Sequence, residues 1–294
     1  MEYPDPRQPI GVFDSGLGGL TVLRAVHERL PAEDLVYFGD TARVPYGTKG
    51  ALTVRNFARQ DAGLLVKLGV KLVIVACNTA SAFALEHLQE TMPVPVIGVI
   101  TPGVLAALRR TRGGPVGVIG TSGTIRSGRY QEGLRAGAEE AVGLPGLAHE
   151  RILVQECPLF VPLVEEGMMG HPITRLALEE YLEPLKKAGV DTLILGCTHY
   201  PLLKEDISAY MGPGVELVDS ADTLAVATEE LLDGMGLLRP DENSKGELSF
   251  HLSDIPWKFA EIGARFLGKS IAEPKIVGLD EMEQAGKIEK EGSS

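Results

Sequence analysis

Seven short apolar runs recur along the chain, and each is followed by a polar or glycine-rich turn and then by a stretch of helical character. They cover residues 9–13, 34–39, 70–76, 94–100, 115–120, 190–196 and 215–219. The runs are apolar throughout rather than alternating, which is typical of strands covered by helices on both faces. Such strands in alternation with helices predict an α/β fold with mainly parallel sheets. Ligands in these folds bind beyond the carboxyl ends of the strands, where the polar turns of this chain fall.

The runs form two similar series. IGVFDSG in the first matches VGVIGTSG in the second, and VIVACNTAS matches LILGCTHYP. Val94 begins the next run 17 residues after Cys77, and Val215 begins it 18 residues after Cys197. The first strand lies further from the cysteine in the second series, which indicates an insertion there. We therefore expect two pseudo-symmetric α/β domains with the active site in the cleft between them.

Composition excludes several classes of protein. A length of 294 residues suffices for two domains. The net charge of −12, without a run of Lys and Arg, argues against nucleic acid as a partner. No apolar stretch reaches bilayer length and the first residues lack the apolar region of a secretory signal, so we expect a cytoplasmic protein that does not bind membranes. Three widely spaced cysteines without a CxxC pair fit neither a disulfide framework nor a structural zinc site.

Cys77 and Cys197 stand at matched strand ends, so both thiols are expected to face one cleft. A thiolate on one side of a substrate carbon and a thiol on the other form a two-base device. One removes a proton and the other delivers a proton to the opposite face, which inverts the configuration. Cys157 has no counterpart in the other series, and we interpret it as a packing residue.

The residues around the two cysteines suit a small anion. Short polar side chains follow each cysteine at positions where helices begin, and backbone N–H groups there attract carboxylates. The hydroxyl and amide donors expected around the anion, including those that follow the run 115–120, are Asn78, Thr79, Thr121, Ser122, Thr124 and Thr198. Two titratable residues are candidate assistants to the thiols: His199 beside Cys197, and Asp14 at the end of the strand that neighbours Cys77. A core histidine and an acid that only caps a turn are the alternative interpretations.

The motifs in chain order resemble glutamate racemases, a branch of the cofactor-independent aspartate/glutamate racemase superfamily. They are GVFDSGLGGLTV, YFGDTARVPYGTK, ACNTAS, VGVIGTSGTIRSG, CPLFVPLVEEG and LGCTHYPLL, spread over residues 9–220. The resemblance implies that Cys77 and Cys197 are the catalytic acid/base pair, assisted by Asp14, His199 and Glu165, although Glu166 is adjacent. It implies substrate contacts from Asp14, Ser15, Tyr46, Gly47, Asn78, Thr79, Thr121, Thr198 and His199.

The same resemblance implies an organisation and a role. The second half would be inserted into the first, so one domain combines 1–100 with 215–270, the other spans 101–214, and 271–294 form a C-terminal strand and a charged tail. The activity would be interconversion of L- and D-glutamate, which supplies D-glutamate for peptidoglycan and cell-wall biogenesis. Neither cofactor nor metal is expected, and the expected assembly is a homodimer.

Three other classes remain open from the sequence. An aspartate racemase, or another amino-acid racemase, would use the same two thiols. A non-catalytic binding protein for a small acid would keep the fold without the chemistry. A thiol redox or metal protein would require the two thiols to touch, whereas racemisation requires a gap the size of the substrate.

Overall fold

The first of two parallel sheets is built from both ends of the chain. The computed structural model describes residues 4–137, 143–241 and 245–288. Six strands lie in the order β10-β9-β2-β1-β3-β4. Their bounds are β1 Ile10–Asp14, β2 Leu35–Gly39, β3 Leu72–Val75, β4 Val96–Gly98, β9 Leu248–Leu252 and β10 Lys275–Ile276. Every pairing between them is parallel.

The second sheet is built from the middle of the chain and repeats the order of the first. Its strands are β5 Val116–Gly120, β6 Ile152–Glu156, β7 Thr192–Gly196 and β8 Glu216–Asp219, in the parallel order β6-β5-β7-β8. This matches β2-β1-β3-β4 strand for strand. Cys77 follows β3 and Cys197 follows the equivalent β7. The predicted pseudo-symmetric α/β fold is confirmed.

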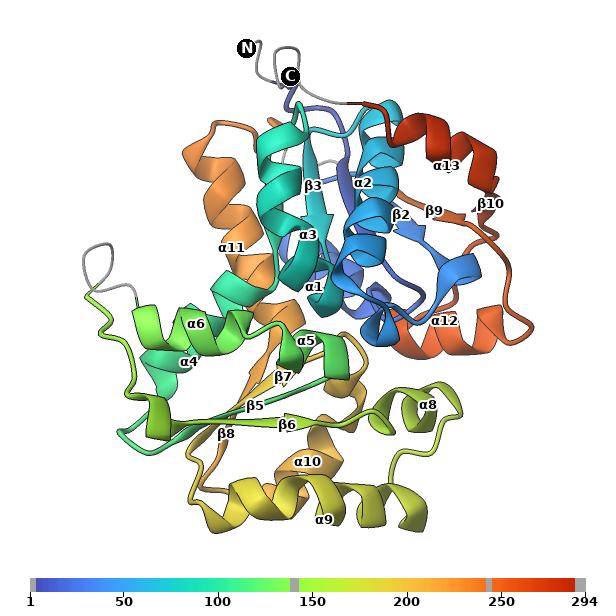
Figure 1. Cartoon of the computed structure of the whole chain (residues 1–294). Coiled ribbons are helices and arrows are strands. Elements are labelled where there is room, and N and C mark those ends of the chain that lie inside the picture. Colours follow the sequence, from blue (N-terminus) through green and yellow to red (C-terminus); the bar gives the residue numbers. More distant parts are fainter. Residues whose placement is uncertain (1–3, 138–142, 242–244, 289–294) are drawn as a thin grey trace.

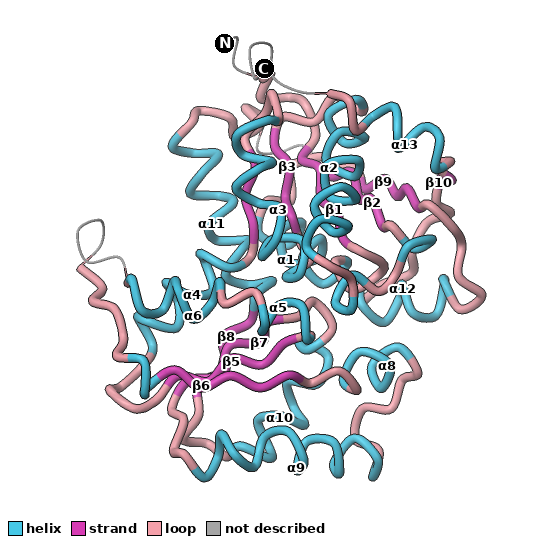
Figure 2. The backbone as a smooth tube through the Cα atoms, in the orientation of Figure 1, coloured by secondary structure: helices cyan, strands magenta, loops and turns pink. Residues whose placement is uncertain are grey.

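Helices cover the sheets (Figures 1 and 2). They are α1 Leu20–Arg29, α2 Ala51–Lys67, α3 Asn78–Thr91, α4 Ile100–Arg110, α5 Ser122–Arg126, α6 Arg129–Ala136, α8 Phe160–Glu165, α9 Pro172–Lys187, α10 Lys204–Met211, α11 Ser220–Gly234, α12 Phe259–Leu267 and α13 Leu279–Ala285. Short 3₁₀ turns lie at η1 Thr41–Arg43, η2 Tyr46–Thr48, η3 His149–Arg151 and η4 Tyr200–Leu203. Figure 1 shows α2 and α3 on one face of the first sheet, and α9 and α10 beyond the second sheet.

Burial on both faces explains why the runs are apolar throughout. In β1, Ile10 and Val12 belong to one core cluster and Phe13 to another. In β3, Leu72 and Ile74 likewise belong to the first cluster, whereas Val73 and Val75 belong to the second. Successive side chains of a strand point to opposite faces, so neither face of this sheet tolerates polar residues.

Four details differ from the sequence-based expectations. Residues 152–156 form an edge strand that was not predicted from the apolar runs. Only part of this strand is buried, so its sequence is not apolar throughout. The run 94–100 is split, since α4 begins at Ile100. The strand 216–219, expected in the first domain, pairs with β7 in the second sheet, and the internal repeat already aligns it with 94–98. The C-terminal part contains α13 as well as a strand, and α13 packs on α2.

The division into two domains remains a proposal, with 1–100 plus 215–270 for the first and 101–214 for the second. We now place residues 215–219 with the second domain because β8 pairs there. The chain then crosses between domains where β4 leads into α4 and where β8 leads into α11. Asp219 caps the start of α11 by accepting a hydrogen bond from the Ala221 N–H at 2.8 Å, which fixes the second crossing.

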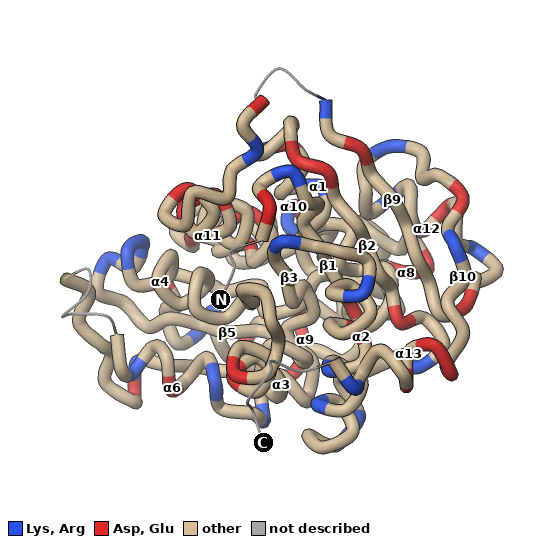
Figure 3. The backbone as a smooth tube through the Cα atoms, turned by 90° about the horizontal axis from the view of Figure 1, so that it is seen from above, with Lys and Arg blue, Asp and Glu red and all other residues tan. Residues whose placement is uncertain are grey.

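Charged residues of both signs are interspersed over the described chain (Figure 3). None of the helices in the described ranges is long and apolar enough to cross a bilayer.

Candidate active site

A cavity of about 180 Å³ lies where the carboxyl ends of the two sheets face each other. Residues of both sheets' loops line it, and both thiols, Cys77 and Cys197, are among them. The lining residues predicted from the sequence are Ser15, Tyr46, Gly47, Asn78, Thr79, Thr121, Ser122, Thr124, Glu165, Thr198 and His199. Apolar walls come from Val44, Pro45, Pro158, Val161 and Pro162. Among the described lining residues there is no Lys or Arg.

Cys77 is fixed by the start of α3. Its sulfur accepts a hydrogen bond from the Ala80 N–H at 3.4 Å, so the cysteine acts as the N-cap of the helix. The Ser15 hydroxyl lies 3.6 Å from the same sulfur. Burial raises the pKa of Cys77 to about 12, and the charge of Asp14 adds to the rise. Cys77 is therefore a protonated thiol at neutral pH.

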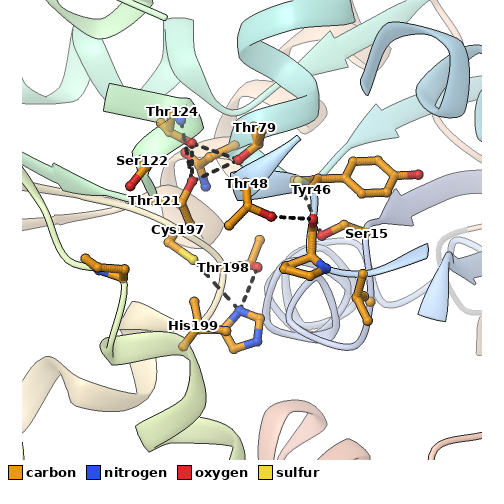
Figure 4. Close-up of a pocket in the computed structure, with 18 of the residues that line it drawn as sticks. Ser15, Tyr46, Thr48, Thr79, Thr121, Ser122, Thr124, Cys197, Thr198 and His199 are labelled. Carbon is orange, nitrogen blue, oxygen red and sulfur yellow. Dashed lines mark hydrogen bonds between the residues drawn. The ribbon is translucent and has the colours of Figure 1, made fainter. Parts of the chain in front are cut away.

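Cys197 belongs to a chain of three titratable groups. Its sulfur lies 3.8 Å from Nδ1 of His199 (Figure 4). Nε2 of the same ring lies 3.0 Å from Oε1 of Glu165. Burial alone would lower the pKa of His199, but the hydrogen bonds and charges of Cys197 and Glu165 raise it to about 10. The imidazole is therefore protonated at neutral pH, and its positive charge sits beside the sulfur.

The two adjacent glutamates have different surroundings. Glu165 lines the cavity and contacts His199. Glu166 turns outward and pairs with Lys258, with 2.6 Å between Oε2 and Nζ. Geometry thus resolves the choice that the sequence left open in favour of Glu165 as the neighbour of His199.

Three threonine hydroxyls join the two sides of the cavity. Thr79 of α3 lies 2.9 Å from Thr121 and 3.1 Å from Thr124, and the last two are 3.0 Å apart. Figure 4 shows this group across the cavity from Thr198 and His199. Gly47 packs against it so closely that an added Cβ would lie 2.8 Å from Cβ of Thr121. A larger residue at position 47 would push the two sides apart.

Two buried polar atoms near the thiols have no partner among the described residues. They are Nδ2 of Asn78 and Oδ1 of Asp14. The other polar atom of each side chain is held: Oδ1 of Asn78 accepts from the Tyr130 hydroxyl at 2.7 Å, and Oδ2 of Asp14 accepts from the Gly16 N–H at 3.0 Å. Such orphaned groups are uncommon in protein interiors, and Asn78, which lines the cavity, is placed to donate its free N–H to a ligand.

Asp14, predicted to assist Cys77 and to contact the substrate, is buried behind the cavity wall. It lies beneath Ser15 and Gly16, which line the cavity, whereas Asp14 is not among the described lining residues. Burial raises its pKa, and the positive charge of His199 partly offsets the rise. Its charge reaches Cys77, whose pKa it raises further.

Tyr46 lines the cavity, yet its hydroxyl points away from the other labelled site residues (Figure 4). The hydroxyl contacts the buried carboxyl groups of Asp40 and Asp61, the latter at 2.9 Å. Arg43 pairs with the same two carboxyls at 2.7 and 3.0 Å. Any contact between Tyr46 and a ligand therefore involves atoms other than the hydroxyl. This polar cluster anchors the cavity wall at residues 44–48, and its ion pairs were not predicted.

Tyr46→Phe is expected to lower the free energy of unfolding by about 1–3 kcal/mol, because two buried carboxyls lose a polar neighbour. KM should change by less than about twofold, since the hydroxyl faces away from the cavity. Denaturant unfolding and steady-state kinetics measure the two effects. The matched control is Tyr210→Phe, because the half-buried Tyr210 donates its hydroxyl hydrogen to Glu183 at 2.7 Å. This change should lower the free energy of unfolding by less than about 1 kcal/mol. A large rise in KM at unchanged stability would place the hydroxyl on the ligand.

Cys157 lies apart from the cavity. All three cysteines are free, but this one is fully buried in the core of the second domain, and burial strongly raises the pKa of its thiol. Its backbone carbonyl accepts a hydrogen bond from the Tyr200 hydroxyl at 2.9 Å. The prediction that it is a packing residue agrees with this position.

Cys157→Ala should leave kcat within about twofold of the unmodified protein and cost about 1 kcal/mol of stability. The thiol is buried outside the cavity and its one polar contact is long, 3.7 Å from the sulfur to the Gln155 carbonyl, so its removal affects packing rather than the cavity. Kinetics and thermal unfolding of the same preparation distinguish the two effects. A hundredfold loss of turnover by a folded variant would mean that Cys157 takes part in the chemistry.

The fold and the cavity together define a class: two-domain, pseudo-symmetric α/β proteins with one free thiol on each side of an interdomain site. Comparisons with known proteins identify the family. The model of the Asp/Glu/Hydantoin racemase family matches residues 10–228, and the chain belongs to that family.

Known relatives within the family are glutamate racemases. The chain is 48% identical over 275 residues to the glutamate racemase of Geobacter metallireducens, covering 94% of this chain and 98% of that protein. It is 50% identical over 271 residues to that of Syntrophus aciditrophicus, covering 92% and 97%.

Solved structures of glutamate racemases resemble the chain along almost its whole length. The Thermus thermophilus glutamate racemase in complex with beta-chloro-D-alanine is 45% identical with a TM-score of 0.81, covering 94% of this chain and 99% of that one. The Francisella tularensis enzyme in complex with D-glutamate is 38% identical with a TM-score of 0.82 and the same coverage.

Proposed function

We propose that the chain interconverts L- and D-glutamate by a cofactor-independent reaction in which two thiols act as acid and base. The observation that carries the proposal is that Cys77 and Cys197 follow equivalent strands of two sheets and line one cavity. The relatives named above are glutamate racemases, and the Francisella protein was solved with D-glutamate.

The protonation states favour a starting direction. His199 places its positive charge beside Cys197, with 3.8 Å between Nδ1 and the sulfur, whereas Cys77 is a protonated thiol. With L-glutamate, the Cys197 thiolate takes the proton from Cα and the C–H electron pair remains on the substrate. The Cys77 thiol then gives its proton to the opposite face, which yields D-glutamate and leaves a thiolate at Cys77. The reverse reaction exchanges the two roles.

The substrate carboxylates have donors on both sides of the cavity. The free amide nitrogen of Asn78 and the hydroxyls of Ser15, Thr79 and Thr121 supply hydrogen bonds. The first turn of α3 presents backbone N–H groups and the positive end of the helix dipole. Hydrogen bonds to the carboxylate favour removal of the Cα proton, since charge moves onto its oxygens during that step.

The biological setting that accompanies this activity is part of the proposal. D-glutamate would serve peptidoglycan and cell-wall biogenesis, the location would be cytoplasmic, and the enzyme would act as a homodimer.

Initial rates with L-glutamate and L-aspartate, measured by chiral chromatography on protein purified without added pyridoxal phosphate, test the activity. We expect turnover of glutamate in both directions, unaffected by a chelator. Faster turnover of aspartate would make the chain an aspartate racemase. Binding of glutamate without turnover in calorimetry would make it a binding protein.

A further inference from the structure

The segment after residue 241 shows no chemistry in its sequence, yet α12 contacts two residues that line the cavity, Glu165 and His199. This helix follows β9 of the first sheet and packs on α1. Its other side contacts α8, which belongs to the half of the chain that carries Cys197 (Figure 1). The contact therefore joins a helix that follows the first sheet to the helix that carries Glu165, in the half of the chain with Cys197.

Arg265 of α12 binds the end of α8 through its backbone. One guanidinium nitrogen, Nη1, donates to the carbonyl of Val164 at 3.0 Å and to that of Glu165 at 2.8 Å. The other, Nη2, is held by Glu261 at 2.8 Å, one helical turn away. A planar guanidinium fixed in this way positions its acceptors more strictly than a lysine would.

The turn after α8 is shaped around this guanidinium. Gly167 has a φ of +72°, a conformation that side chains disfavour. A Cβ at Gly167 would lie 2.7 Å from Nη2 of Arg265. The backbone conformation favours glycine, and any larger residue would displace the guanidinium from its place, which is an observation independent of the hydrogen bonds.

Phe266, the next residue of α12, contacts His199, the residue that Glu165 hydrogen-bonds. Its fully buried ring lies 5.0 Å from the His199 ring, centroid to centroid, with an edge-to-face angle of 79°. Such contacts fix ring orientation. Two successive residues of α12 thus hold Glu165 through its backbone and His199 through its ring.

We propose that Arg265 is a positioning residue for the reaction, which acts by holding Glu165 against His199 and thereby holding His199 at Cys197. The inference rests on the proposed function, because it assigns Arg265 to one of the two thiols. Phe266 supports the same arrangement by packing on the imidazole.

A double-mutant cycle tests whether Arg265 acts through Glu165. Arg265→Gln is expected to lower kcat/KM for glutamate about tenfold, because Glu165 is no longer held in place. In a Glu165→Gln background, the same change should cost less than about twofold, since the group it positions is already lost. Losses that multiply in the double variant would overturn the proposal, because a merely structural role predicts independent effects.

Lys258→Gln is the matched control. Lys258 lies at the start of the same helix and pairs with Glu166, so it joins the same two elements without contacting Glu165. Loss of this exposed ion pair should lower kcat/KM by less than about twofold. Should the glutamine variant of Arg265 fail to fold, Arg265→Lys replaces it. The lysine ammonium keeps the positive charge but lacks the planar, two-nitrogen guanidinium. We expect a smaller loss of kcat/KM, which again vanishes in the Glu165→Gln background. A loss at Lys258 equal to that at Arg265 would contradict the assignment.

A readout without turnover separates this inference from the proposed function. Iodoacetamide labelling at pH 7, followed by mass spectrometry, gives the rates at Cys197 and Cys77 separately. Arg265→Gln should lower the ratio of Cys197 to Cys77 labelling at least about threefold, since thiolate reactivity depends on the neighbouring positive charge. An unchanged ratio would overturn the positioning role even if the enzyme racemises glutamate. A lowered labelling ratio in a protein that does not racemise glutamate would support the positioning of His199 at Cys197 by Arg265 and contradict the proposed racemase activity.

Discussion

Cys77→Ser and Cys197→Ser are each expected to lower kcat for glutamate racemisation by at least about 10³-fold in both directions. A serine hydroxyl neither gives nor takes a proton as readily as a thiol, so either change removes one of the two proton-transfer groups. Because both groups are needed in every turnover, neither single variant should retain half of the activity. Chiral chromatography of D- and L-glutamate measures the loss.

The folded state should survive both changes. Serine is a favourable helix N-cap, so the hydrogen bond that Cys77 accepts from the Ala80 N–H has a natural replacement. Cys157→Ala is the matched control, because it removes the third thiol from outside the cavity. Substantial turnover in a folded Cys77→Ser or Cys197→Ser variant would show that the remaining thiol suffices.

His199→Asn is expected to lower kcat/KM about 10²-fold, since Cys197 loses the adjacent positive charge. The equilibrium constant of a racemisation is fixed at one, so kcat/KM must fall equally in both directions. The loss of kcat should nevertheless differ between directions, because His199 contacts Cys197 and not Cys77. Alkylation of Cys77 should be unaffected. His149→Asn, a change on the exposed turn η3, is the control. Identical losses of kcat in both directions would count against a one-sided role.

The raised pKa of His199 also predicts a pH dependence of stability. The histidine titrates near 6.5 in the unfolded chain and at about 10 in the folded one. A group whose pKa rises on folding stabilises the protein fully below its unfolded pKa and loses that contribution as the pH rises through the folded value. The stability difference between the unmodified protein and His199→Asn should therefore shrink between pH 6 and pH 10 in urea unfolding. A difference that grows with pH would contradict the protonated state of His199.

Much of the fold and the centre of the site could be predicted from sequence because they depend on local pattern. Buried parallel strands are apolar on both faces, so β1, β3, β5 and β7 stand out as runs. Cysteines at the ends of β3 and β7 must face the cleft if the two halves are alike. The glutamate racemase motifs then indicate the polar residues around them.

The remainder depends on contacts between segments that are distant in sequence. The edge strand β6 is only partly buried, so it carries no apolar run. The direction of the Tyr46 hydroxyl is set by Asp40 and Asp61, which the motif alone does not connect with it. Arg265 looks like an ordinary charge on an amphipathic helix until α12 is seen against α8. Only the packing distinguishes Glu165 from Glu166.

The most direct test of the two-thiol account is the deuterium content of each enantiomer after a few per cent conversion of L-glutamate in D₂O. Cys197 removes the Cα proton from one face and Cys77, exchanged with solvent, supplies deuterium to the other. The account predicts that the D-glutamate formed carries deuterium at Cα while the remaining L-glutamate stays protonated. Equal labelling of recovered L-glutamate and newly formed D-glutamate would contradict it, because a single base that exchanges with solvent labels both pools.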